Sequence, residues 1–228
     1  MSPARPTPAA IVFDNDGLLL DTEDAWTRAE LVLFGRRGRT FTMDHKRDLI
    51  GSSRLVAAAK LEEMLEAPGE GLALMDELHE LVMEEARHDI PVRPGALDLL
   101  AAIRVAGVPV ALASNSVREF VERTLQGAGL EGAFEIVVTA EDVEHGKPEP
   151  DIYLEACRRL GAAPGDCTAL EDSPPGVAAA HAAGMYVVGV PYLDVHLPEA
   201  DVVAPSLADP AVYAALGLDG RPPAATRG

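Results

Sequence analysis

The chain has 228 residues, of which 48% are hydrophobic and 25% charged, so it can bury a sizeable core and is too apolar for a disordered polypeptide. Its 37 acidic residues outnumber 19 Lys and Arg and give a formal charge of −18, which disfavours nucleic acid and anionic membranes as partners. No apolar stretch is long enough to cross a bilayer, and residues 1–8 lack the apolar core of a signal peptide. We therefore expect a cytoplasmic protein.

The first predicted element is a buried strand over residues 9–12, and two carboxylates follow it. Asp14 and Asp16 precede a glycine and lie two residues apart, so the period of two along an extended chain places them on one face. Two close carboxylates do not both ionise readily without a cation or a proton. The pair therefore predicts metal-assisted or acid–base chemistry. Asp21 and Thr22, slightly further on, are expected to cap the next helix.

The region from residue 23 to residue 90 shows helical periodicity and no convincing strand. Leu74, Leu78 and Val82, for example, share one face of a predicted helix. A block of helices inserted directly after the first strand is expected to lie over the active-site edge of a sheet, where it would act as a cap.

From Val92 onward, apolar strands alternate with amphipathic helices. The pattern predicts helices at 95–106, 117–127, 151–160 and 176–183, and strands at 108–113, 136–139, 167–170, 186–190 and 201–204. Ser116 and Glu119 have the spacing of a capping box at the start of the second helix. Alternating strands and helices predict an α/β fold, with a Rossmann-like and mostly parallel sheet covered by helices on both faces.

These patterns divide the chain into two predicted domains. Residues 1–22 and 91–228 form the α/β catalytic core, and residues 23–90 form an all-helical cap domain. The Pro-, Ala- and Arg-rich tail after about residue 220 is expected to be disordered.

Four polar segments lie at or just after predicted strands. Asp14, Ser114 and Asp172 each end an apolar strand, and Lys147 lies in the Pro-rich loop after another. In such sheets ligands bind outside the carboxyl ends of the strands. We therefore expect these four residues to meet at one edge.

In its motifs, the chain resembles the haloacid dehalogenase superfamily of phosphotransferases, in the branch of beta-phosphoglucomutase and the small sugar-phosphate phosphatases. The resemblance extends from Ile11 to about Leu207. It rests on an ordered set: Asp14-Asn15-Asp16-Gly17, then Ser114, then Lys147, then Glu171-Asp172. Each element is weak alone, whereas the ordered set on matching strands is specific.

The resemblance implies a role for each matching residue. Asp14 would attack phosphorus and form an aspartyl-phosphate, and Asp16 would protonate the leaving oxygen and then accept a proton from water. Lys147 would neutralise the phosphoryl charge. A phosphoryl oxygen would accept a hydrogen bond from Ser114, with the Asn115 amide close by.

The implied cofactor is Mg²⁺. Asp172, an oxygen of Asp14 and the main-chain carbonyl of Asp16 would hold the ion. For Glu171 the resemblance leaves three possibilities open: it could bind Mg²⁺ directly, bind it through a water molecule, or lie behind the residues that bind the ion. Asp16 itself argues against dehalogenase chemistry, in which no leaving oxygen needs a proton.

Two cap positions bear on the choice between a phosphatase and a mutase. Gly51-Ser52-Ser53-Arg54 resembles the mutase segment whose arginine holds the non-reacting phosphate of a bisphosphorylated sugar, although Arg54 could equally be a solvated surface residue. Trp26 occupies the position where the mutases have a histidine, and an indole cannot relay a proton. Both Arg54 and Trp26 are candidate substrate contacts.

We therefore expect a Mg²⁺-dependent phosphatase that hydrolyses a small phosphomonoester, such as a sugar phosphate. A beta-phosphoglucomutase-type mutase is the alternative. A non-catalytic binding or regulatory relative is disfavoured because no group of the catalytic set is missing. The expected partner is a small phosphorylated metabolite, and the expected state is a monomer.

Overall fold

A parallel sheet runs through the part of the chain that the computed structural model describes, residues 6–87 and 90–218. Its six strands have the order β3-β2-β1-β4-β5-β6, which is the doubly wound order of Rossmann-like folds. The strands are β1 (Ala10–Phe13), β2 (Val110–Ser114), β3 (Ile136–Thr139), β4 (Cys167–Glu171), β5 (Tyr186–Gly189) and β6 (Val202–Val203). The predicted α/β fold class is confirmed.

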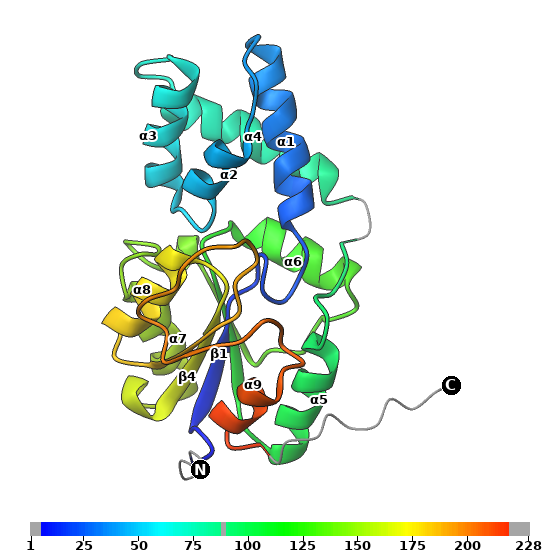
Figure 1. Cartoon of the computed structure of the whole chain (residues 1–228), viewed down its shortest axis with the longest axis vertical. Coiled ribbons are helices and arrows are strands. Elements are labelled where there is room, and N and C mark those ends of the chain that lie inside the picture. Colours follow the sequence, from blue (N-terminus) through cyan, green and yellow to red (C-terminus); the bar gives the residue numbers. More distant parts are fainter. Residues whose placement is uncertain (1–5, 88–89, 219–228) are drawn as a thin grey trace.

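Helices cover both faces of the sheet (Figure 1). Ile11 and Phe13 of β1 point to one face and belong to the core with α5, α6 and α9, whereas Ala10 and Val12 point to the opposite face and pack with α7 and α8. Strand β1 is apolar on both faces because helices cover both faces and exclude solvent. The helices of this core are α5 (Ala96–Ala106), α6 (Arg118–Gly127), α7 (Asp151–Leu160), α8 (Pro174–Ala182) and α9 (Pro210–Ala215), with short 3₁₀ helices η1 (Ala140–Asp142) and η2 (Pro164–Asp166).

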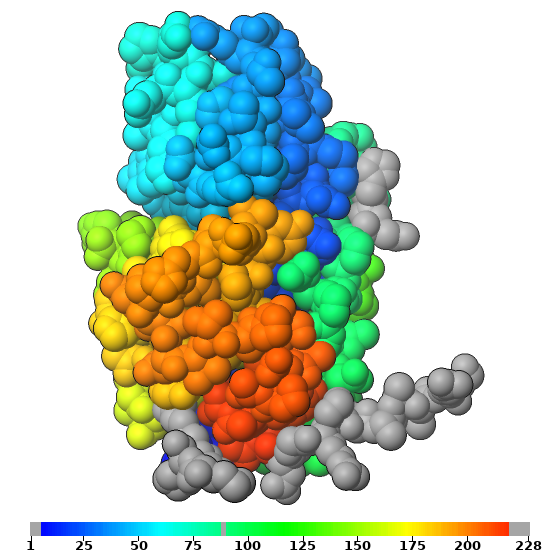
Figure 2. Space-filling view, viewed as in Figure 1, coloured from blue at the N-terminus to red at the C-terminus, as the bar shows by residue number. Residues whose placement is uncertain are grey.

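Four further helices stand together beyond the carboxyl ends of the strands (Figure 1). They are α1 (Glu23–Arg36), α2 (Met43–Leu49), α3 (Arg54–Leu65) and α4 (Gly71–Glu85), and they follow β1 directly in the chain. We call them the cap. Figure 2 shows the cap, in blue and cyan, in contact with the core along a continuous seam on the face in view. An inserted all-helical cap was the predicted arrangement.

The two chain segments that join cap and core lie side by side. Leu20 and Val92 form an antiparallel bridge, and the Asp21 amide donates to the Pro91 carbonyl at 2.8 Å. The Arg93 amide donates to the Leu19 carbonyl at 2.9 Å. Because the entering and leaving segments are hydrogen-bonded, they fix where the cap begins relative to β1.

Several element boundaries differ from the sequence prediction. Strand β2 ends at Ser114 rather than one residue earlier, and α8 begins at Pro174 because proline fits the first turn, where no amide is required. Helix α9 was not predicted. Within residues 6–87 and 90–218, every helix is too short or too polar to span a bilayer. The tail after about residue 220 lies outside the described residues.

Gly95 allows α5 to begin against the segment that precedes α9. Its φ of 88° is one that side chains rarely adopt, and an added Cβ would lie 2.4 Å from the Ala208 amide nitrogen. Gly107 at the other end of α5 has a φ of 70° and open space around it. Both glycines therefore adopt a positive φ, but only Gly95 also lies in close contact with another segment.

We predict that Gly95→Ala destabilises the fold more than Gly107→Ala. Both variants adopt an unfavourable φ at a cost of about 1 kcal/mol, and Gly95→Ala adds a backbone clash that costs about 1–3 kcal/mol more. Urea denaturation of the two variants and the wild-type protein measures the difference. Equal losses of unfolding free energy would contradict the proposed packing at Gly95.

Candidate active site

The predicted catalytic side chains meet at the carboxyl edge of the sheet. Strand β1 lies between β2 and β4, so Asp14, which follows β1, lies between Ser114 at the end of β2 and Asp172 after β4. Lys147 comes from the loop between η1 and α7. All four side chains are buried. The four segments that the sequence analysis singled out therefore meet around one point.

Lys147 is the central cation of this group. Its Nζ donates to Asp14 Oδ1 at 2.5 Å, to Glu171 Oε1 at 2.6 Å and to the Ala113 carbonyl at 2.9 Å. Burial alone would lower the pKa of the ammonium, but the charges of Asp14 and Glu171 outweigh burial and raise that pKa. Lys147 therefore stays protonated and leaves no N–H group without an acceptor.

Glu171 lies behind Lys147, where protein donors surround its carboxylate. Oε1 accepts from Lys147 Nζ and from the Tyr153 hydroxyl, and Oε2 accepts from the Asp172 amide at 3.1 Å and from the Ser173 hydroxyl at 3.3 Å. Of the three possibilities left open by the sequence, these contacts favour a place behind the metal ligands. Tyr153 escaped the sequence analysis because, on an apolar helix face, it resembles any core aromatic.

Two buried carboxylate oxygens at this edge have no protein partner. Asp14 Oδ2 and Asp172 Oδ2 accept no hydrogen bond from any described residue. One oxygen each from Asp14, Glu171 and Asp172 lie within 4.8 Å of one another. Burial raises the pKa of both Asp14 and Asp172 well above the usual value, and the neighbouring carboxylates raise both further. Clustered oxygens that lack a partner suit a hard divalent cation, so the residues present fit Mg²⁺.

Asp16 is surrounded by hydroxyl groups. Its Oδ1 accepts from Thr22 Oγ1 at 2.8 Å, and its Oδ2 accepts from Ser114 Oγ at 2.7 Å and from Ser116 Oγ at 2.9 Å. In this structure Ser114, a candidate donor to a phosphoryl oxygen, thus donates to Asp16. These bonds orient the carboxyl group.

The same bonds correct two capping predictions. Thr22 does precede α1, but its side chain makes no cap hydrogen bond. The residue that precedes α6 is Val117 rather than the predicted Ser116, and valine has no group that could cap the helix. Thr22 and Ser116 bind Asp16 instead. Sequence spacing alone could not show that a carboxylate from another segment competes for these hydroxyls.

The Asn115 side chain joins three segments. Nδ2 donates to the Gly51 carbonyl of the cap at 3.0 Å and to the Lys147 carbonyl at 3.1 Å, while Oδ1 accepts from the Lys147 amide at 2.8 Å. Asn115 was expected to lie beside the phosphoryl group through its amide. Its side chain also ties the cap loop to the backbone of Lys147, which no local sequence signal indicates.

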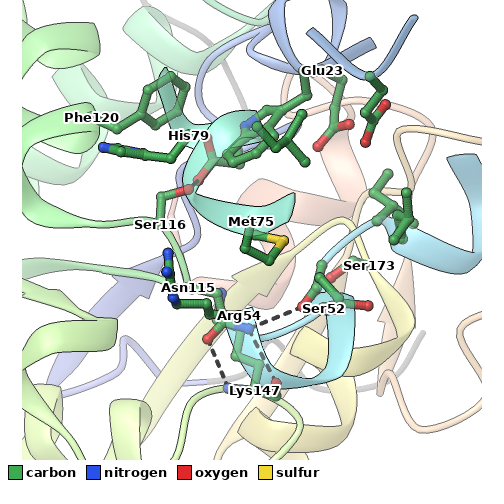
Figure 3. Close-up of a pocket in the computed structure, with 18 of the residues that line it drawn as sticks. Glu23, Ser52, Arg54, Met75, His79, Asn115, Ser116, Phe120, Lys147 and Ser173 are labelled. Atoms are coloured by element: carbon green, nitrogen blue, oxygen red, sulfur yellow. Dashed lines mark hydrogen bonds between the residues drawn. The ribbon is translucent and has the colours of Figure 1, made fainter. Parts of the chain in front are cut away.

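A cavity of about 110 Å³ separates the cap from these core residues. Side chains from both units line it, as Figure 3 shows for Arg54, Met75 and His79 of the cap and for Asn115 and Lys147 of the core. Trp26 and Arg54, the two cap residues predicted to contact the substrate, both line this cavity. Trp26 packs edge-on against Phe120, with ring centroids 5.5 Å apart.

Arg54 lines the cavity but already has an anionic partner. Its guanidinium lies 2.5 Å from Asp76 Oδ1, and 39% of its side chain is exposed. Asp76 is 70% exposed and occupies one nitrogen of the guanidinium, so Arg54 as a substrate contact and Arg54 as a solvated surface residue both stay predictions.

Comparisons with known proteins agree with this geometry. The haloacid dehalogenase-like hydrolase family matches residues 8–184. The chain belongs to this family. It is 35% identical over 202 residues to hexitol phosphatase A of Escherichia coli, covering 86% of this chain and 90% of that protein.

Two further similarities come from a plant and a bacterium. A bifunctional riboflavin kinase/FMN phosphatase of Arabidopsis thaliana is 35% identical over 205 residues, and the match covers 88% of this chain but only 54% of that longer protein. A CbbY variant from Rhodobacter sphaeroides, solved with xylulose 1,5-bisphosphate, superimposes with a TM-score of 0.78 at 27% identity, covering 93% of this chain and 99% of that one.

Membership in the haloacid dehalogenase-like hydrolases confirms the family that the ordered motifs predicted. The similarity to named phosphatases also confirms the expected enzyme class, a phosphoric monoester hydrolase. The predicted residue roles remain predictions, although the structure brings Asp14, Asp16, Lys147 and Asp172 together as those roles require.

The sequence analysis missed a buried charged cluster in the cap. Lys46 of α2 lies between two carboxylates of α1, with its Nζ 2.6 Å from Glu23 Oε2 and 3.2 Å from Glu30 Oε2. All three residues line the cavity and are at most 5% exposed. Their sequence context resembles that of solvated charges on amphipathic helices, so only the packing of α1 against α2 distinguishes them. We call them the Glu23–Lys46–Glu30 cluster.

Glu30 should make stability depend on pH. Burial raises its pKa to about 7 against the attraction of Lys46. A carboxyl group whose pKa is higher in the folded state than in the unfolded state stabilises the folded protein. This contribution is complete below the unfolded-state pKa and is lost as the pH rises through the folded-state pKa, here about 7. We predict that, from pH 5 to pH 8, the unfolding free energy of the wild-type protein falls by about 1–2 kcal/mol relative to Glu30→Gln.

Urea denaturation of both proteins at the two pH values measures this effect. Glu77→Gln is the matched control, because hydrogen bonds from Arg37 and Arg36 hold the pKa of Glu77 below its usual value. Glu77 thus stays ionised throughout, and its replacement should leave the pH dependence unchanged. Parallel pH curves for the wild-type protein and Glu30→Gln would rule out a raised pKa at Glu30.

Proposed function

We propose that this chain is a Mg²⁺-dependent phosphatase that hydrolyses a small sugar phosphate through a phosphorylated Asp14. One observation carries the proposal. Asp14 is buried at the cavity with Oδ1 on Lys147 and with Oδ2 lacking any partner among the described residues. A buried carboxylate held by one oxygen presents the other to an incoming electrophile. The similarity to hexitol phosphatase A supports the substrate class.

The reaction has two displacements at phosphorus. Asp14 attacks the phosphoryl group as the bond to the leaving oxygen breaks, and Asp16 gives that oxygen a proton. Water then attacks the same phosphorus, Asp16 takes its proton, and the bond to Asp14 breaks to release inorganic phosphate. Three hydroxyls hold the Asp16 carboxyl group beside the cavity, which supports a role in both transfers.

The cations around Asp14 offset the charge of its substrate. Lys147, 2.5 Å from Asp14 Oδ1, would stabilise negative charge on the phosphoryl oxygens during transfer. Asp14 and Asp172, with the main-chain carbonyl of Asp16, would hold Mg²⁺. When bound, the ion would reduce the repulsion between Asp14 and the phosphoryl group. Glu171 would hold Lys147 in place rather than bind the ion.

The remaining polar residues would orient the phosphoryl group and the cap. A phosphoryl oxygen would accept a hydrogen bond from Ser114 once that hydroxyl leaves Asp16, with the Asn115 amide nearby. The cap, residues 23–90, would exclude water and contact the leaving group through Trp26 and Arg54. Trp26 favours hydrolysis over mutase chemistry, because an indole cannot relay a proton.

We predict that Asp14→Asn abolishes hydrolysis of p-nitrophenyl phosphate. An amide is a poor nucleophile, so kcat should fall by at least about a thousandfold. Phosphate release by purified protein measures the loss. Asp151→Asn, which changes a partly exposed aspartate paired with His145, is the matched control and should retain normal turnover. Near-normal activity of Asp14→Asn would refute the proposal.

We also predict that activity depends on Mg²⁺ and releases free phosphate. A chelator should reduce turnover of p-nitrophenyl phosphate to background, and added Mg²⁺ should restore it. With beta-glucose 1-phosphate, inorganic phosphate should accumulate without glucose 6-phosphate. Chelator-resistant turnover would exclude the metal role, and formation of glucose 6-phosphate would show a mutase.

A further inference from the structure

The Glu23–Lys46–Glu30 cluster shares a cavity with Asp14 but takes no part in the proposed reaction. Each of its side chains is buried in the cap and lines that cavity. Burying such groups is costly unless they are paired, and here two carboxyl groups contact one ammonium. Carboxyl groups on the wall of a substrate cavity are a feature that can discriminate between ligands.

The ammonium of this cluster has no donor to spare. Lys46 Nζ lies 2.6 Å from Glu23 Oε2, 3.2 Å from Glu30 Oε2 and 3.4 Å from the Glu23 carbonyl, which accounts for its three N–H groups. A second phosphate bound here would need donors and would meet two carboxylates. Lys46 therefore supplies no site for an anion.

The other basic groups of the cavity wall do not change this balance. Arg54 is paired with Asp76, and Lys147 is held by Asp14 and Glu171. His79 is the remaining basic side chain among the described residues that line the cavity. Within the cluster, two carboxyl groups therefore face one ammonium that has no N–H group to spare.

Hydroxyl groups are the ligands that such a wall can recognise. A hydroxyl donates one hydrogen bond, carries no charge, and bonds strongly to a carboxylate. Apolar side chains beside the cluster, among them Trp26, Met75 and Phe120, can cover a carbon skeleton. Figure 3 shows Glu23, Met75 and Phe120 among the side chains gathered around the cavity.

We propose that the Glu23–Lys46–Glu30 cluster determines substrate specificity by accepting hydrogen bonds from the hydroxyls of the leaving group. The cluster selects a neutral, hydroxyl-rich monophosphate and rejects a bisphosphate. Lys46 holds the two carboxylates in place, and Glu30, further along α1 from the metal-binding edge, contacts the hydroxyls. The inference rests on the proposed function and names the leaving group that the site accepts.

The test compares three substrates in the presence of Mg²⁺. Sorbitol 6-phosphate carries hydroxyls and one phosphate, fructose 1,6-bisphosphate carries a second phosphate, and p-nitrophenyl phosphate carries no hydroxyl. For the wild-type chain we expect kcat/KM to be at least about tenfold higher for sorbitol 6-phosphate than for fructose 1,6-bisphosphate.

Substitution of Glu30 separates recognition from folding. Glu30→Leu removes the acceptor and should lower kcat/KM for sorbitol 6-phosphate by about tenfold or more, with less than about a twofold change for p-nitrophenyl phosphate. Glu30→Gln keeps a neutral acceptor of the same length and should lose less. Glu77→Leu is the control: Glu77 is a cap carboxylate held by two arginines and absent from the cavity wall, so the substrate ratio should not change.

Each contrary outcome would overturn one part of the proposal. Equal losses of Glu30→Leu on both monophosphates would assign the cluster a structural role. A kcat/KM for fructose 1,6-bisphosphate that equals or exceeds the value for sorbitol 6-phosphate would reject the selection of hydroxyl-rich monophosphates. If circular dichroism shows Glu30→Leu unfolded, Glu30→Gln decides by the same ratio. Absence of any p-nitrophenyl phosphate hydrolysis by the wild-type chain would instead reject the phosphatase function itself.

Discussion

The ion pair between Lys147 and Asp14 is the interaction around which this active site is built. Both groups are buried, and a charge in such surroundings is tolerated only beside an opposite charge. Glu171 completes the group from behind, and Tyr153 and the start of α8 hold Glu171 in turn. The cost of burying this network explains why so many of the surrounding side chains are hydrogen-bond donors.

The parallel sheet makes that network possible. Strands β2, β1 and β4 are adjacent and end at the same edge, so residues more than 150 positions apart in the chain, Asp14 and Asp172, become neighbours. The strands are mostly apolar on both faces, and the polar residues of the site lie at their carboxyl ends or just after them, such as Ser114 at the end of β2 and Glu171 at the end of β4. The interior of the sheet thus packs as a core, and its edge is left for polar side chains.

The cap supplies what the sheet edge lacks, which is a cavity wall opposite Asp14 and Asp172. Its two connections to the core are hydrogen-bonded to each other, and Asn115 ties the loop at Gly51 to the backbone of Lys147. Contact between cap and core is therefore linked to the position of Lys147. Under the proposed function, specificity and chemistry would come from different segments of the chain that meet at one cavity.

The sequence by itself determined the fold class, the inserted helical cap and the family, because strand periodicity and ordered motifs are local signals. It also predicted Asp14, Asp16, Lys147 and Asp172 as site residues, and these side chains meet at one cavity. Only the tertiary structure decided which partners the hydroxyls of Thr22 and Ser116 take, that Glu171 and Tyr153 lie behind Lys147, and that Lys46 is buried between Glu23 and Glu30. A side chain's partner depends on which distant segments pack against it. Local spacing does not encode that choice, so the capping roles predicted for Thr22 and Ser116 were wrong.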